Sequence, residues 1–104
     1  MDMAFVKVYS VAKLQPDSVA EVLIAGYPIA LCNFAGWIRA IEGICPHQGG
    51  PLGQGAMNGE NVVCPWHAWE FSCKTGENDF DPDTRVRTIC VRVEGDDILV
   101  DSNA

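Results

Sequence analysis

Cys45-Pro46-His47 and Cys64-Pro65-Trp66-His67 are two short segments of similar make-up, separated by sixteen residues. Each segment supplies one thiol and one imidazole, and the two histidines of the chain both lie here. Thiolates and imidazoles together suit iron–sulfur clusters, zinc or copper. The proline after each cysteine fixes one backbone angle and stiffens the loop. The pattern therefore predicts a metal site whose ligands are Cys45, His47, Cys64 and His67.

A glycine-rich run over residues 49–55 follows the first segment. Glycine lets a backbone come close to a bound group, and the N–H groups of such a loop can donate hydrogen bonds to anionic sulfides. A structural zinc site is the alternative. Zinc sites usually pair two cysteines two to four residues apart and two histidines three to five apart. Each segment here mixes one cysteine with one histidine, which disfavours zinc.

With this spacing the chain resembles the Rieske 2Fe–2S family, in which two cysteines hold one iron and two histidines hold the other. The resemblance runs from about residue 6 to residue 101 and includes the Pro-Leu-Gly-x-Gly run at 51–55, Phe71 and Thr75-Gly76. It implies one 2Fe–2S cluster on Cys45, His47, Cys64 and His67. It also implies supporting or docking roles near the cluster for Gly49, Gly50, Trp66, Trp69 and Pro82.

The resemblance suggests what these supporting residues do. Gly50 and Trp66 stand where high-potential members carry two extra cysteines, and Trp69 stands where those members carry a serine that donates to a sulfide. A potential toward the lower end of the Rieske range, about −150 mV, is therefore expected. Pro82 is the candidate for the proline of a loop that covers the cluster in this family, and an ordinary surface loop is the alternative. Trp66 lies at a loop tip, where it either docks a partner or shields the cluster from water.

The length of 104 residues predicts a single domain, 1–104, with a cluster-binding subdomain at about 43–76. Short apolar runs alternate with turn residues, and no segment has the period of a long amphipathic helix. The expected fold class is all-β, an antiparallel sandwich or barrel. Residues 86–93 alternate in polarity and predict one strand, whereas residues 55–61 are expected to form turns.

Three of the five cysteines, Cys32, Cys73 and Cys90, remain once two are assigned to the metal. Cys32 and Cys90 lie in apolar runs and are expected to be buried, while Cys73 lies beside a turn and is expected to be partly exposed. The chain shows neither a leader pattern nor an apolar run near eighteen residues. A cytoplasmic protein whose remaining thiols are reduced is expected.

A net charge of −7 disfavours nucleic acid and anionic membranes as partners and favours a protein with a basic docking face. The resemblance is to soluble Rieske ferredoxins of bacterial aromatic-ring dioxygenases. It implies a monomeric one-electron carrier between an NAD(P)H-dependent flavin reductase and a Rieske non-haem iron terminal oxygenase. The small Rieske subunit of a nitrite reductase is the alternative. No histidine is left for a mononuclear iron, so an enzyme is not expected.

Overall fold

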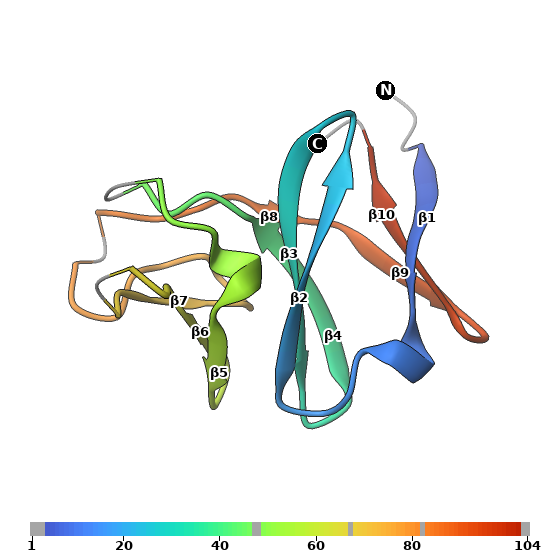
Figure 1. Cartoon of the computed structure of the whole chain (residues 1–104), viewed down its shortest axis with the longest axis horizontal. Helices are drawn as coiled ribbons and strands as arrows, with labels where there is room; N and C mark the ends of the chain where they lie inside the picture. Colours follow the sequence, from blue (N-terminus) through green and yellow to red (C-terminus); the bar gives the residue numbers. More distant parts are fainter. Residues whose placement is uncertain (1–3, 47–48, 67, 82, 103–104) are drawn as a thin grey trace.

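The computed structural model describes residues 4–46, 49–66, 68–81 and 83–102. Within them the chain forms three antiparallel sheets, shown side by side in Figure 1. The first sheet has the order β1 (Phe5–Ser10), β10 (Asp97–Asp101), β9 (Val91–Glu94). The second has the order β2 (Ser18–Ile24), β3 (Tyr27–Phe34), β4 (Trp37–Glu42), β8 (Thr88–Ile89). The third has the order β5 (Ala56–Asn58), β6 (Asn61–Val63), β7 (Glu70–Ser72).

Two single turns of 3-10 helix, η1 (Val11–Lys13) and η2 (Leu52–Gln54), are the helical elements of the described chain. The expected all-β, antiparallel fold is therefore confirmed. The third sheet and the loops at its end lie toward the left of Figure 1 and pack against the middle sheet.

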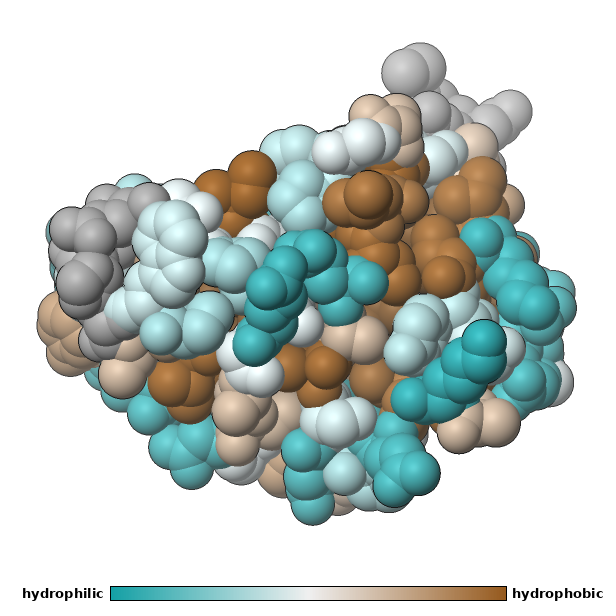
Figure 2. Space-filling view, viewed as in Figure 1, coloured by the Kyte–Doolittle hydropathy of each residue, from teal (hydrophilic) through white to brown (hydrophobic). Residues whose placement is uncertain are grey.

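The middle sheet has a core on each of its faces. Along β3, Ile29 and Leu31 pack into the core shared with the first sheet, while Ala30 and Cys32 pack into the core shared with the third. Successive side chains of a strand point to opposite faces, so a central strand covered on both sides reads as a continuous apolar run. In the space-filling view, hydrophobic surface gathers where β2 faces the first sheet (Figure 2).

The two long hairpins of the second sheet turn at Ala25-Gly26 and Ala35-Gly36. All four residues have positive φ, at 51° and 82° in the first turn and 51° and 94° in the second. Positive φ at both central positions defines the type I′ turn, one of the two turn types whose twist matches the flanking strands of a two-residue hairpin. Alanine is disfavoured there, since its Cβ crowds the backbone.

Replacing Ala35 by asparagine is therefore expected to stabilise the fold by about 0.5–1 kcal/mol, because asparagine tolerates the left-handed conformation better. Urea unfolding measures the change. The matched variant Gly36→Ala should lower the free energy of unfolding. The reason is the left-handed backbone alone, because a Cβ at this position meets nothing within 4 Å. Equal midpoints for the two variants would contradict the explanation.

The single strand expected over 86–93 is wrong, because the chain changes sheet in its middle. β8 pairs with β4 in the second sheet, and β9 pairs with β10 in the first. Cys90 lies between them, with its carbonyl accepting a hydrogen bond from the backbone N–H of Asp101 at 3.1 Å. The turn expected over 55–61 also contains a strand, β5, which pairs with β6 around Gly59.

Candidate metal centre

The first predicted ligand loop follows β4 and closes on itself through two backbone hydrogen bonds. The N–H of Cys45 donates to the carbonyl of Gly50 at 2.8 Å, and the N–H of Gly49 donates to the carbonyl of Cys45 at 2.7 Å. Gly49 has a φ of +78°, which this tight closure requires and which glycine adopts without cost. The loop thus folds back over the cysteine that opens it.

The second loop follows β6 and repeats the same closure. The N–H of Cys64 donates to the carbonyl of Trp69 at 2.7 Å, and the N–H of Ala68 donates to the carbonyl of Cys64 at 3.1 Å. Ala68 has a φ of +59°, at the place that Gly49 holds in the first loop. The two loops therefore close with the same pair of hydrogen bonds and the same left-handed residue. In the sequence, the histidine follows the cysteine by two residues in the first loop and by three in the second.

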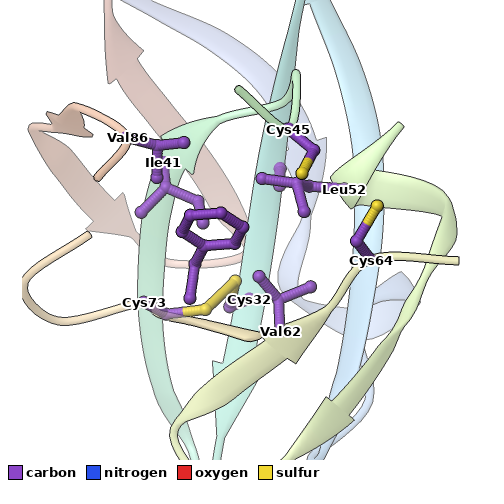
Figure 3. Packing of buried hydrophobic residues seen from close by; sticks show 10 residues of the cluster. Cys32, Ile41, Cys45, Leu52, Val62, Cys64, Cys73 and Val86 are labelled. Atoms are coloured by element: carbon purple, nitrogen blue, oxygen red, sulfur yellow. A yellow bond between two sulfur atoms is a disulfide. The ribbon is translucent and has the colours of Figure 1, made fainter. Parts of the chain in front are cut away.

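The two cysteines that open these loops have buried thiols that face each other, as Figure 3 shows. The thiols of Cys45 and Cys64 are within hydrogen-bonding reach. Burial raises the pKa of the Cys64 thiol, an N–H from Trp66 lowers it, and the nearby Cys45 raises it further. Two converging thiols fit the sulfur half of a binuclear iron site, and metal binding would displace their protons.

The other two predicted ligands, His47 and His67, lie outside the described residues. So does Pro82, the candidate lid residue. Among the residues that are described, no group of three or more His, Cys, Asp or Glu side chains comes together. The structure therefore brings together the two predicted cysteines, and the four-ligand assignment stays a prediction.

Gly50 is pressed against the second loop. A Cβ at this position would lie 2.6 Å from the sulfur of Cys64 and 3.2 Å from the Trp66 ring. Real Cβ atoms essentially never come that close, so either the sulfur or the loop must move. Gly50 therefore allows the two loops to approach each other, and this close approach is what a shared metal site needs.

Replacing Gly50 by alanine is expected to lower the iron bound per chain by about half or more, since a thiolate fixed to iron cannot move aside. Iron analysis together with visible absorption measures this. Gly49→Ala is the matched control, because a Cβ there meets nothing within 4 Å and only the left-handed backbone is strained. Equal iron loss in both variants would show that packing against Cys64 is not the reason.

Aromatic side chains surround the second loop. The ring of Trp69 lies edge-on to Phe80, with 5.0 Å between centroids, and 6.5 Å from Phe71. Phe71 is buried in the core and Trp69 packs against it, whereas Trp66 is 49% exposed and Phe80 is 64% exposed. Trp66 and Phe80, which we call the tip aromatics, are thus two exposed aromatic side chains at the second loop: Trp66 lies in it, and Phe80 packs on its Trp69.

Phe80 is a site residue that the sequence analysis missed. Its loop is held in place by the buried side chain of Asn78, whose Oδ1 accepts hydrogen bonds from the N–H groups of Phe80 and Asp81. Asp81 in turn accepts hydrogen bonds from the N–H of Asp83 and the hydroxyl of Thr84. The sequence did contain a feature that could have indicated Phe80, since it is a single aromatic residue between two aspartates.

The three remaining cysteines differ from expectation. Cys32 and Cys73 form a disulfide, so the expectation of reduced thiols is wrong for them. Cys73, expected to be partly exposed, is buried because it packs into the same core as Cys32. Cys90, expected to be buried, is exposed. It follows β8 at the crossover between sheets, where neither core covers it.

The chain matches the family model of the Rieske [2Fe-2S] domain over residues 4–93. The ferredoxin component of biphenyl 2,3-dioxygenase from Rhodococcus jostii strain RHA1 is 33% identical to it over 95% of this chain and 94% of that protein. A ferredoxin of carbazole 1,9a-dioxygenase, solved in complex with its oxygenase, superposes with a TM-score of 0.86. That chain is 25% identical, and the match covers 97% of this chain and 95% of that one.

A third similar structure is described as the small subunit of an NADPH nitrite reductase. It superposes with a TM-score of 0.80 at 26% identity, over 94% of this chain and 98% of that one. Dioxygenase ferredoxins and nitrite reductase small subunits were the two predicted classes of relative. Proteins of both classes are thus similar to this chain over nearly their whole length.

The fold and the paired cysteine loops define a small iron–sulfur protein. The chain belongs to the Rieske [2Fe-2S] domain family, and the cofactor of that domain is one 2Fe–2S cluster. The relatives that match it over nearly their whole length include the ferredoxin components of biphenyl and naphthalene dioxygenases, which are the electron-transfer parts of multicomponent oxygenases. The prediction that this chain is an electron-transfer component and not an enzyme is confirmed by those names. No helix in the described ranges has the length and apolar character needed to cross a membrane.

Proposed function

We propose that this chain is a soluble, cytoplasmic, monomeric one-electron carrier that serves a Rieske non-haem iron terminal oxygenase in the degradation of aromatic compounds. An NAD(P)H-dependent flavin reductase would supply the electrons. Similarity over nearly the whole chain to the biphenyl dioxygenase ferredoxin component is the observation that carries this proposal. The small subunit of a nitrite reductase is the second candidate, favoured by the similar structure of such a subunit.

In this proposal the cluster is held by the thiolates of Cys45 and Cys64 and by the imidazoles of His47 and His67. The cluster supplies reversible uptake of one electron. The chain buries the two thiols, which limits their contact with water, and the Trp66 N–H helps to hold the Cys64 sulfur. We also propose that the cluster-binding part, about residues 43–76, is a subdomain of a single domain spanning 1–104. The separate third sheet supports this division.

The test is reconstitution with a candidate reductase and a candidate terminal oxygenase, measuring product formed at the expense of NADH. The carrier role predicts product that depends on this protein and increases with its concentration until another step limits the rate. A fixed nitrite reductase subunit would instead co-purify with a larger polypeptide and restore nitrite reduction. Reconstitution that works equally well without the chain would contradict the proposal.

The tip aromatics are the proposed contact with the oxygenase. Exposed tryptophan and phenylalanine near a redox centre offer apolar area at low entropic cost, as residues at the centre of interfaces do. Acidic side chains flank Phe80 in the sequence, at Asp79, Asp81 and Asp83. With a net charge of −7, this arrangement fits a partner that presents an apolar centre and a basic rim.

Replacing Trp66 by alanine is expected to slow electron transfer to the oxygenase about tenfold, which corresponds to losing one interface anchor. The visible and EPR spectra of the cluster should change little. Trp37→Ala is the matched control: Trp37 is 64% exposed but lies in the β3–β4 hairpin, away from the two cysteine loops. If both tryptophan variants transfer electrons at the unaltered rate, Trp66 does not dock the partner.

A further inference from the structure

The disulfide between Cys32 and Cys73 joins two parts of the fold that are far apart in sequence. Cys32 lies in β3 of the middle sheet, and Cys73 follows β7 of the third sheet. Their sequence separation is 41 residues. The segment between them contains both cysteine loops and all four proposed ligands. The disulfide therefore closes a covalent ring around the part of the chain assigned to the cluster.

The same core holds the disulfide and the two thiols of the metal centre. One buried cluster, which contains Phe71, also contains all four of these cysteines. Figure 3 shows the disulfide on one side of Leu52 and Val62, which belong to the same cluster, and Cys45 and Cys64 on the other. A change in how the third sheet is held against the middle sheet thus acts on the packing that positions Cys45 and Cys64.

The Cys73 end of the disulfide lies nearer the surface than the Cys32 end, although both residues are buried. Two cavities, of about 300 Å³ and about 200 Å³, are both lined by Arg39, Cys73 and Lys74. Cys32 lines neither cavity and is fully buried. An attacking thiolate would therefore meet the sulfur of Cys73 first. Arg39 and Lys74 line both cavities, against one carboxylate, Glu60, in the larger cavity. This excess of positive charge favours the approach of an anionic nucleophile.

We propose that Cys32–Cys73 is a redox-sensitive staple, opened by a dithiol reductant at Cys73, whose closed state retains the cluster. One thiolate of the reductant attacks the Cys73 sulfur, the S–S bond breaks, and Cys32 leaves as a thiolate and takes up a proton. The second thiol of the reductant then displaces Cys73 as a thiol. The reductant ends as a disulfide, and the pair has gained two electrons and two protons.

The closed ring retains the cluster because a cross-link restricts the open, disordered states of the segment between its ends. Cluster loss requires that segment to open, so it is slower when the ring is closed. This consequence depends on the proposed ligands, which all lie within the ring. Disulfides that occur in reducing compartments are usually transient or redox-sensing, which suits a staple that a dithiol can open.

The first experiment maps the thiols of the intact, cluster-loaded protein by alkylation and peptide mass spectrometry. The background is Cys90→Ser, which removes the exposed thiol. A cross-linked Cys32–Cys73 peptide is expected before dithiothreitol and two alkylated cysteines after it. Two further variants each leave one cysteine of the pair free. Alkylation of Cys73 in Cys32→Ala should be at least about tenfold faster than alkylation of Cys32 in Cys73→Ala, because only Cys73 lines the cavities. Equal reactivity, or no cross-linked peptide under any condition, would overturn the proposal.

The second experiment follows loss of cluster absorption to an iron chelator, with and without prior dithiothreitol. Cys90→Ser is expected to lose its cluster about fivefold faster after the staple is opened. The variant that also carries Cys32→Ala and Cys73→Ala should lose it at the faster rate under both conditions, which controls for effects of the reductant on iron. Equal rates before and after opening in Cys90→Ser would refute the staple.

The two proposals fail separately. If the protein binds no 2Fe–2S cluster, the proposed function fails, while peptide mapping and the unfolding midpoint with and without dithiothreitol still test the staple. If the cluster binds but opening the disulfide changes neither the rate of its loss nor the unfolding midpoint, the staple fails and the carrier role stands.

Discussion

A Cys64→Ala variant is expected to purify colourless, with iron content and visible absorption reduced to near background. A 2Fe–2S cluster of this type has one iron held by two thiolates, and losing either leaves that iron under-coordinated. The structure adds a second reason. The Cys64 sulfur interacts with the Cys45 thiol and the N–H of Trp66, and Gly50 is pressed against it, so its loss also removes a packed contact between the two loops. Iron analysis and the EPR spectrum after dithionite measure the loss.

Cys90→Ala is the matched control, since it also removes a free cysteine but one that is exposed. It should keep its colour and its rate of electron transfer. His47→Ala and His67→Ala are expected to behave like Cys64→Ala, because the second iron depends on them in the proposed assignment. Stoichiometric iron and an unchanged spectrum in any of these three ligand variants would remove that residue from the set.

Gly55→Ala is expected to lower the free energy of unfolding by about 3 kcal/mol, because overpacking against backbone cannot be relieved by a rotamer change. The φ of Gly55 is −87°, so a left-handed conformation is not the reason for glycine here. A Cβ would collide with the carbonyl oxygen of Val63, the last residue of β6 before Cys64. The midpoint of thermal unfolding should fall by roughly 15 °C.

Gly59→Ala separates the effect of space from the effect of backbone conformation. Gly59 has a φ of +61°, but a Cβ at this position would meet nothing within 4 Å. Alanine there should therefore cost only about 1 kcal/mol. Circular dichroism in a urea series measures both variants. A larger loss of stability for Gly59→Ala than for Gly55→Ala would contradict the assignment of Gly55 to close packing.

Local pattern was enough to predict the longest strand of the middle sheet. One of the short apolar runs, residues 27–34, lies between Gly26 and Ala35-Gly36, has the length and punctuation of a strand, and forms β3. The same kind of reasoning failed over 86–93. Alternation continues through Cys90, yet the chain changes sheet there, and alternation says nothing about which neighbour a strand pairs with.

The candidate site was predictable where it depends on residue type and spacing. Cys45 and Cys64 were paired from their motifs, and the structure brings their thiols together. Phe80 was missed because its approach to Trp69 depends on the loop that Asn78 holds. The equivalence of the two loops was also hidden, because Gly49 and Ala68 share a left-handed conformation but not a residue type.

By itself, the sequence determined the family, the all-β class and the predicted ligand set, because short motifs and strand periodicity are carried by residues near each other in the chain. Tertiary structure alone decided that Cys32 is joined to Cys73, that Cys90 is exposed, and that Phe80 packs on Trp69 of the second loop. These features depend on which distant segments become neighbours. Which segments become neighbours is decided by the packing of a core on each face of the central sheet, and local sequence patterns carry no information about it.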